Sequence, residues 1–186
     1  MPKIDASKIL IISTNGFEQS ELEFPRDQLR VKGATVHVAT LDGETIKGWE
    51  GSDWGREAEA DLKVADANVA DYDALVIPGG QINPDILRTD DDVLNLVRSF
   101  ESAGKPIAAV CHAPWVLVEA GIAKGRKMTS YHSIRTDVEN AGAEWTDASA
   151  VVGNGVITSR NPEDLKDFVS AIVDEIEAST ATATAA

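Results

Sequence analysis

The residue best suited to chemistry in this chain is its one cysteine, Cys111. It directly follows a short apolar run, Pro106–Val110, and it has alanine two positions before it and two positions after it. Small residues at those positions are typical of a nucleophile elbow, a sharp strand-to-helix turn that exposes a reactive side chain. The N-terminus of the following helix would favour a thiolate. The pattern therefore favours a nucleophile over a buried structural cysteine, the usual role of an isolated one.

Two backbone groups could serve this cysteine. The N–H of His112 is well placed to bind an oxyanion, and the N–H of Gly80, in the Gly79-Gly80 pair, could complete the oxyanion hole. A plain tight turn is the alternative for the glycines. The His112 imidazole could act as a general base, but neighbouring side chains usually point apart, so a packing role stays open.

Carboxylates are the next candidates. Glu18 opens the first predicted helix, where it either suits the helix dipole or points at the thiol to move protons. Asp85, in Asn83-Pro84-Asp85, is expected from the residues alone to be an early-turn helix residue. His132 lies in a predicted loop, for which a surface role is favoured.

Metal and cofactor sites are not predicted. The chain has three scattered histidines and lacks the zinc, phosphate-loop and complete dinucleotide-binding motifs. Its formal charge of −14 argues against binding to nucleic acid or an anionic membrane. A single cysteine needs no oxidising compartment, and no signal peptide or membrane anchor is recognised, so a cytoplasmic protein is expected.

The chain of 186 residues fits one domain, expected over residues 1–177, with a flexible low-complexity tail over 178–186. Apolar strand-like runs alternate with helical segments, which predicts an α/β protein with a mostly parallel sheet covered on both faces. Residues 42–72 are predicted to form an insertion, in part a hairpin. The predicted strands are 8–14, 35–40, 74–78, 106–110, 127–131, 150–152 and 156–159, and the predicted helices are 18–32, 90–103, 113–120, 134–141 and 162–176. Ligands of such sheets bind beyond the carboxyl ends of the strands, where the loops 15–18, 79–83 and 111–114 are expected to converge.

Three motifs, in this order and spacing, resemble the ThiJ/PfpI superfamily, and most of all its intracellular protease I branch. They are Gly16-Phe17-Glu18, Val76–Gly80 and Ala109–Pro114, and the stretches Thr136–Trp145 and Thr158–Asp164 also fit. The resemblance extends from about residue 8 to residue 176.

The resemblance implies a flavodoxin-like three-layer sandwich and a homodimer or higher homo-oligomer. It implies Cys111 as the nucleophile with Glu18 beside it, and an oxyanion hole made by the Gly80 and His112 amides. In protease-like members an acid from a neighbouring subunit completes a Cys-His-acid triad, and Asp85 is the matching residue here.

Three functions share this one predicted site. The first is a stress-related enzyme of the glyoxalase or deglycase type, in which the Cys111 thiolate adds to a small reactive carbonyl and Glu18 moves the proton. The second is an intracellular cysteine peptidase that uses Cys111, His112 and Asp85 on a peptide substrate. The third is a non-enzymatic redox sensor or stress chaperone, in which an accessible thiolate is oxidised.

Overall fold

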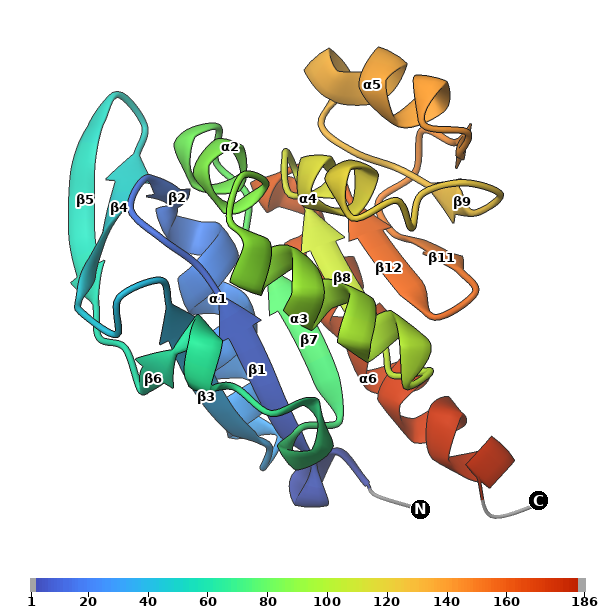
Figure 1. The fold of residues 1–186 in the computed structure, drawn as a ribbon, viewed down its shortest axis with the longest axis horizontal. Coiled ribbons are helices and arrows are strands. Elements are labelled where there is room, and N and C mark those ends of the chain that lie inside the picture. Colours follow the sequence, from blue (N-terminus) through green and yellow to red (C-terminus); the bar gives the residue numbers. More distant parts are fainter. Residues whose placement is uncertain (1–2, 184–186) are drawn as a thin grey trace.

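The computed structural model describes residues 3–183, which are built around a seven-stranded sheet (Figure 1). The strand order is β11-β12-β8-β7-β1-β3-β6, and every pair is parallel except β11 with β12. The strands are β1 (Lys8–Ile12), β3 (Thr35–Thr40), β6 (Leu62–Lys63), β7 (Ala74–Ile77), β8 (Ile107–Val110), β11 (Val151–Gly153) and β12 (Val156–Ser159). The predicted mostly parallel sheet is confirmed.

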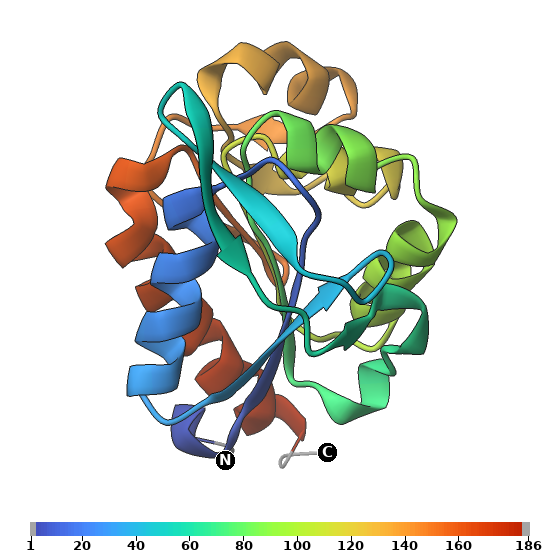
Figure 2. The ribbon, with the colours of Figure 1, turned by 90° about the vertical axis from the view of Figure 1, so that its left-hand side faces the viewer.

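Helices cover both faces of the sheet, which gives three layers. The apolar residues of β1 alternate between the two faces: Leu10 and Ile12 pack with α3 and α4, while Ile9 and Ile11 pack with α1 and α6. Figure 2 shows α1 and α6 side by side on one face, with α3 on the other. The helices are α1 (Gln19–Val31), α2 (Ile82–Leu87), α3 (Asp91–Ser102), α4 (Pro114–Glu119), α5 (Arg135–Asn140) and α6 (Leu165–Ala183).

Two small sheets lie outside this core. The predicted insertion contains an antiparallel hairpin, β4 (Ile46–Glu50) with β5 (Asp53–Ala58), and β2 (Phe17–Glu18) joins β4 in parallel. The predicted strand at 127–131 is shorter than expected, since only β9 (Lys127–Met128) is a strand and it pairs with β10 (Glu144–Trp145).

Short 3-10 helices connect several of these elements. They are η1 (Ile4–Ala6), η2 (Val64–Asp66), η3 (Val69–Asp71), η4 (His132–Ile134) and η5 (Pro162–Asp164). The closing helix α6 extends to Ala183, so it includes the first part of the predicted tail, and residues 184–186 lie outside the described residues.

The strands β8, β7 and β1 are neighbours in the sheet, so their carboxyl ends lie next to one another. The loops that leave these ends are the three that carry the predicted motifs. The early-turn helix position predicted for Asp85 is confirmed by α2, which begins only two residues after Gly80 and contains Pro84. Proline is tolerated there because a first-turn N–H has no partner within the helix.

Candidate active site

Cys111 lies directly after β8, in a turn whose backbone has an unusual conformation. Its φ is 63°, in the left-handed region that residues other than glycine rarely adopt. Its N–H donates to the Ser159 carbonyl at 2.9 Å, and its own carbonyl accepts from the Tyr131 N–H at 2.8 Å. Ala109 and Ala113, the small residues of the predicted elbow, are fully buried. The turn therefore holds a strained cysteine at the sheet edge, at a cost on the order of 1–3 kcal/mol.

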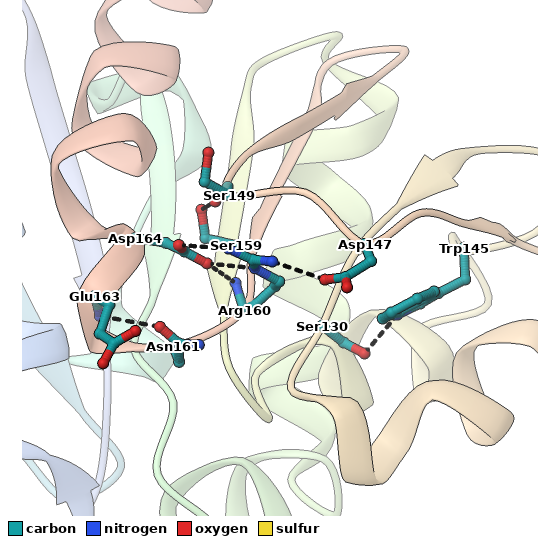
Figure 3. Close-up of polar contacts among 9 residues, drawn as sticks. All are labelled: Ser130, Trp145, Asp147, Ser149, Ser159, Arg160, Asn161, Glu163 and Asp164. Carbon is teal, nitrogen blue, oxygen red and sulfur yellow. Dashed lines mark hydrogen bonds and ion pairs between the residues drawn. The ribbon is translucent and has the colours of Figure 1, made fainter.

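A charged cluster supports this turn from the β12 side (Figure 3). Arg160 follows Ser159, whose carbonyl binds the Cys111 N–H. The Arg160 guanidinium contacts both carboxylate oxygens of Asp164, at 2.8 and 2.9 Å, and one oxygen of Asp147, at 2.7 Å. Bidentate pairing of this kind fixes geometry as well as adding energy, so the cluster holds the strand end on which the elbow depends.

The Gly79-Gly80 turn packs tightly against the cysteine. A Cβ on Gly79 would lie 2.6 Å from the Cys111 Cβ and 2.6 Å from the Val110 carbonyl oxygen, so only glycine fits. Gly80 has a φ of 79°, which glycine adopts without strain. The backbone N–H groups of Gly80 and His112 both lie against the Cys111 sulfur, where they favour the thiolate.

Asn83, which the sequence analysis did not single out, holds this turn in place. Its amide nitrogen donates to the Pro78 carbonyl at 2.8 Å and to the Gly79 carbonyl at 3.3 Å. Its amide oxygen accepts from the Thr14 N–H at 2.7 Å and from the Ser13 hydroxyl at 3.2 Å. One buried side chain thus ties the ends of β1 and β7 together. The signal for Asn83 in the sequence was a polar residue directly before the proline of the helical turn predicted at Asp85.

Glu21 is the carboxyl group that lies against the thiol, and the sequence analysis missed it. It is fully buried, and its neighbours are the Cys111 thiol and the Gly79 and Gly80 backbone. Neither of its oxygens has a hydrogen bond of good geometry within the described part of the chain. Burial, and next the nearby charge of Glu18, raise the pKa of Glu21 to about 8. At neutral pH this carboxyl is therefore mostly protonated and able to donate.

Glu18, the predicted partner of the thiol, lies at the rim of the site. It immediately precedes α1, is half-buried, and its N–H donates to the Gly79 carbonyl at 3.3 Å. Burial and then the charge of Glu50 raise its pKa. Between residues 3 and 183 no hydrogen bond joins its side chain to the Cys111 thiol.

The His112 imidazole contacts the thiol, although the two residues are adjacent in sequence. Its Nδ1 lies 3.2 Å from the Cys111 Sγ, and its Nε2 lies 3.1 Å from the Ser133 hydroxyl. The ring stacks on Tyr131 with centroids 4.7 Å apart. Burial and then the charge of His132 lower the pKa of His112, so the neutral imidazole, a proton acceptor, is favoured.

These groups open into a cleft of about 490 Å³. Aromatic and polar side chains share its walls, and the Cys111 side chain, only 6% exposed, lies at its base. Trp49 and Tyr131 line it, whereas Trp54 packs edge-on against Trp49 outside. Its lining is Glu18, Glu21, Trp49, Gly51, Gly80, Gln81, Cys111, His112, Tyr131, Ser133 and Pro162.

Asp85 lies apart from these residues in this chain. It is exposed on α2, and the described residues record no bond between it and His112. Residues 3–183 contain no group of three or more histidine, cysteine or acidic side chains arranged to bind a metal ion. Within the same range, every helix is too short or too polar to cross a membrane.

The chain is similar to proteins of one family along most of its length. It matches the DJ-1/PfpI family over residues 7–175. It is 40% identical to the deglycase TK1284 of Thermococcus kodakarensis over 85% of this chain and 92% of the relative. It is 37% identical to YraA of Bacillus subtilis, named as a candidate cysteine protease, over 88% of this chain and 94% of the relative. General stress protein 18 of the same organism is 40% identical, over 87% of this chain and 92% of the relative.

Among solved structures, DJ-1beta of Drosophila melanogaster superposes with a TM-score of 0.82 at 30% identity. The match covers 96% of this chain and 97% of that one. The similarity thus includes the strands, helices and turns that carry the site described above.

Proposed function

Because this chain belongs to the DJ-1/PfpI family, we propose that it is a cysteine-dependent enzyme acting on small reactive carbonyl compounds. The observation that carries the proposal is the buried Glu21 carboxyl, with a pKa of about 8, beside the Cys111 thiol. A nucleophile, a protonated acid and two backbone N–H donors then share one cleft. These are the groups that addition to a carbonyl requires. The deglycase name of a relative at 40% identity supports the same class of reaction.

The thiol must first lose its proton. Burial, together with a negative charge on Glu21, raises the pKa of Cys111 and opposes the thiolate. Protonated Glu21 removes the second of these effects, and its O–H can donate to the sulfur. His112 Nδ1, 3.2 Å from the sulfur, is placed to accept the thiol proton. The result is a thiolate paired with an imidazolium and stabilised by the Gly80 and His112 N–H groups.

The addition step uses this pair on a 2-oxoaldehyde such as methylglyoxal. The thiolate forms a bond to the aldehyde carbon, and the carbonyl oxygen takes the proton of Glu21, which gives a hemithioacetal. The Glu21 carboxylate then removes the hydrogen of that carbon as a proton and delivers it to the neighbouring carbon, while the hydroxyl proton moves to the second oxygen.

Water completes the reaction. The hydrogen shift leaves a 2-hydroxyacyl thioester on Cys111, and hydrolysis by one water molecule releases the 2-hydroxy acid as its anion, with one proton passing to the solvent. The other proton set free in this step returns to Glu21, and the His112 imidazolium returns its proton to the sulfur, which restores the thiol. The net change is an internal redox shift plus hydrolysis, so no electron carrier is needed. Adducts that the same aldehydes form with amino or thiol groups are expected to enter through the same addition step.

We also propose a cellular setting for this activity. Activity on toxic aldehydes suits a cytoplasmic stress protein, and the general stress protein among the relatives supports this. A homodimer or higher homo-oligomer is proposed as the working form. The exposed α2, which carries Asp85, would then lie where a second copy could approach the cleft.

The direct test follows lactate formed from methylglyoxal by the purified chain. Wild-type protein is expected to form lactate, and Cys111→Ser is expected to lose at least about 1,000-fold in kcat/KM, because a serine hydroxyl is far less readily ionised. A Ser99→Ala variant, changed at an exposed hydroxyl that bonds the Asn95 carbonyl, serves as the control. Undiminished lactate formation by Cys111→Ser would eliminate the proposal.

A peptidase is the second candidate, and the 3.2 Å contact between the Cys111 Sγ and the His112 Nδ1 favours it. It requires an acid on the far side of the imidazole, for which Asp85 of a second subunit is the predicted residue. Cleavage of fluorogenic peptides that is lost in Asp85→Asn would support it. Lactate formation without peptide cleavage would count against it.

A further inference from the structure

The two nitrogens of the His112 ring have different partners. The Nδ1 faces the Cys111 Sγ at 3.2 Å, and the Nε2 faces the Ser133 hydroxyl at 3.1 Å. The three side chains therefore form one continuous row from sulfur to hydroxyl. Ser133 belongs to the same chain and was not among the residues predicted from the sequence.

The segment that carries Ser133 is attached to the elbow itself. The Tyr131 N–H donates to the Cys111 carbonyl at 2.8 Å, and the Tyr131 ring stacks on His112 at an interplanar angle of 27°. Ile134, at the end of η4, is 1% exposed and anchors the other side. Ser133 is thus held from both sides, so its place at the imidazole is fixed by the fold.

We propose that Ser133 is a positioning residue that holds His112 in the tautomer with a free Nδ1, and so makes Cys111–His112–Ser133 a relay within one chain. The inference rests on the proposed function in one respect, that Cys111 is the nucleophile. It adds the residue that orients the base, a role that the family resemblance assigned to an acid of another subunit.

In the resting state the His112 Nε2–H donates to the Ser133 oxygen, so the Nδ1 lone pair faces the thiol. The Cys111 S–H bond then breaks and its proton moves to Nδ1. The ring becomes an imidazolium, the sulfur a thiolate, and the Ser133 oxygen still accepts the Nε2–H. Without that oxygen, the cationic Nε2–H would lose its hydrogen-bond partner in this chain, which disfavours the imidazolium.

Other titratable groups around the ring are few. The His132 ring lies tilted against the Tyr131 ring, with centroids 4.4 Å apart, and its charge opposes a second positive charge on His112. Asp137 accepts a hydrogen bond from the Trp115 indole N–H, and Arg88 lies over the Trp115 ring. Within the described residues, the contacts recorded for these two charged groups therefore include Trp115 and not the His112 ring. The ionisable groups on the cleft side are Glu18, Glu21, Cys111 and Tyr131.

The experiment measures the rate at which iodoacetamide alkylates Cys111 between pH 5 and 10, followed by intact mass. The S–C bond forms as iodide leaves, and only the thiolate reacts, so the midpoint of the profile reports ionisation of the thiol. Because Cys111 is the only cysteine, no other thiol contributes. The probe is small and does not depend on turnover of any substrate.

Four variants separate orientation from structure. Ser133→Ala is expected to move the midpoint to higher pH and to slow alkylation at pH 7 about 10-fold. Ser133→Thr keeps a hydroxyl and is expected to stay within about 2-fold of wild type. Ser133→Asp places a carboxylate at Nε2, which favours the imidazolium and moves the midpoint to lower pH. Ser99→Ala, at an exposed serine on α3, is expected to match wild type.

Opposite shifts for the alanine and aspartate variants, with rescue by threonine, would support the inference. Equal midpoints in wild type and Ser133→Ala would overturn it, as would slow alkylation in every variant. A midpoint that moves in Asp85→Asn but not in Ser133→Ala would assign the role to the other subunit's acid and also overturn it. If the shifts are seen and no lactate forms from methylglyoxal, the proposed function fails and the inference stands.

Discussion

The Cys111 sulfur has an acid on one side and a base on the other, and the two sides differ in access to solvent. Glu21 has no exposed surface and lies between α1 and the Gly79-Gly80 turn, at the base of the cleft. His112 is also nearly buried, but its far edge reaches Ser133 at the wall of the cleft. Burial keeps the acid protonated and the base neutral, because it penalises the charged form of each.

This difference in solvent access shows how one pocket can keep two proton transfers separate. On the enclosed side, a proton can move only between Glu21 and whatever is bound to the sulfur. On the open side, the proton taken from the thiol can be exchanged through the cleft. If the two sides have these separate roles, substitutions on the Glu21 side and on the His112 side should have different effects.

The largest effect is expected on the enclosed side. Glu21→Gln keeps the shape of the side chain but cannot exchange a proton, so kcat/KM for methylglyoxal should fall about 100- to 1,000-fold. Glu18→Gln, at the rim, should cost less than about 10-fold, since its role would be limited to the local field. Lactate assays on both variants at pH 7 make the comparison. Equal losses of kcat/KM in the two variants would mean that Glu18 at the rim is as important for the proton transfer as Glu21 beside the sulfur, which contradicts the separate role proposed for Glu21.

Gly79→Ala tests the packing of the same side. The added Cβ would meet the Cys111 Cβ and the Val110 carbonyl oxygen, so overpacking should cost about 1–3 kcal/mol in the free energy of unfolding. Alkylation of Cys111 should slow as well, because the Glu21 carboxyl and the sulfur must shift. Gly104→Ala meets no atom within 4 Å and has a φ of 65°. It should lose stability without slowing alkylation, and slow alkylation in both variants would point to a global effect.

His112→Gln tests the open side. It removes the base and leaves the backbone N–H at the sulfur intact, so alkylation at pH 7 should slow about 10- to 100-fold. The loss should shrink at high pH, where hydroxide removes the thiol proton. Stopped-flow alkylation across pH 6–10 gives both values. A constant deficit at every pH would mean that the ring only packs.

The last effect builds up gradually over several pH units, as a dependence of stability on pH. The pKa of Glu21 is raised from 4.5 to about 8 on folding, so the folded chain binds a proton that the unfolded chain releases. Its contribution to stability is complete below pH 4.5 and is lost as pH rises toward 8, with a slope of at most about 1.4 kcal/mol per pH unit. Urea denaturation of wild type and Glu21→Gln should show this slope only in wild type. Parallel curves would mean that Glu21 ionises normally.

Much of the fold could be predicted because the strands are continuous apolar runs that end at glycine or at the motifs. The match over residues 7–175 confirms the family that three motifs indicated. The turn at Cys111 could be predicted because small residues leave a local pattern. The catalytic roles of Glu18, His112, Gly80 and Asp85 remain predictions.

Three parts of the site could not be predicted, for separate reasons. Glu21 was missed because Glu18 is part of the first motif, although the buried residues of α1 place Glu21 beside Leu22 on its inward face. The Cys111–His112 contact depends on the left-handed φ of Cys111, which neighbouring residue types do not reveal. Asn83 and Ser133 act through bonds to residues far along the chain or to an adjacent turn, and such bonds leave no periodicity.

The left-handed backbone of Cys111 has a further consequence for how this sequence can change over generations. Position 111 would suit glycine better than cysteine, and Cys111→Gly should relieve strain of about 1 kcal/mol. Replacement of Cys111 by glycine is therefore opposed by selection for the thiol and by the packing of its buried side chain, and not by the backbone conformation. In a lineage that no longer needed this chemistry, the cysteine would be among the first residues of the site to disappear, and its persistence in a population would itself report that the thiol is in use.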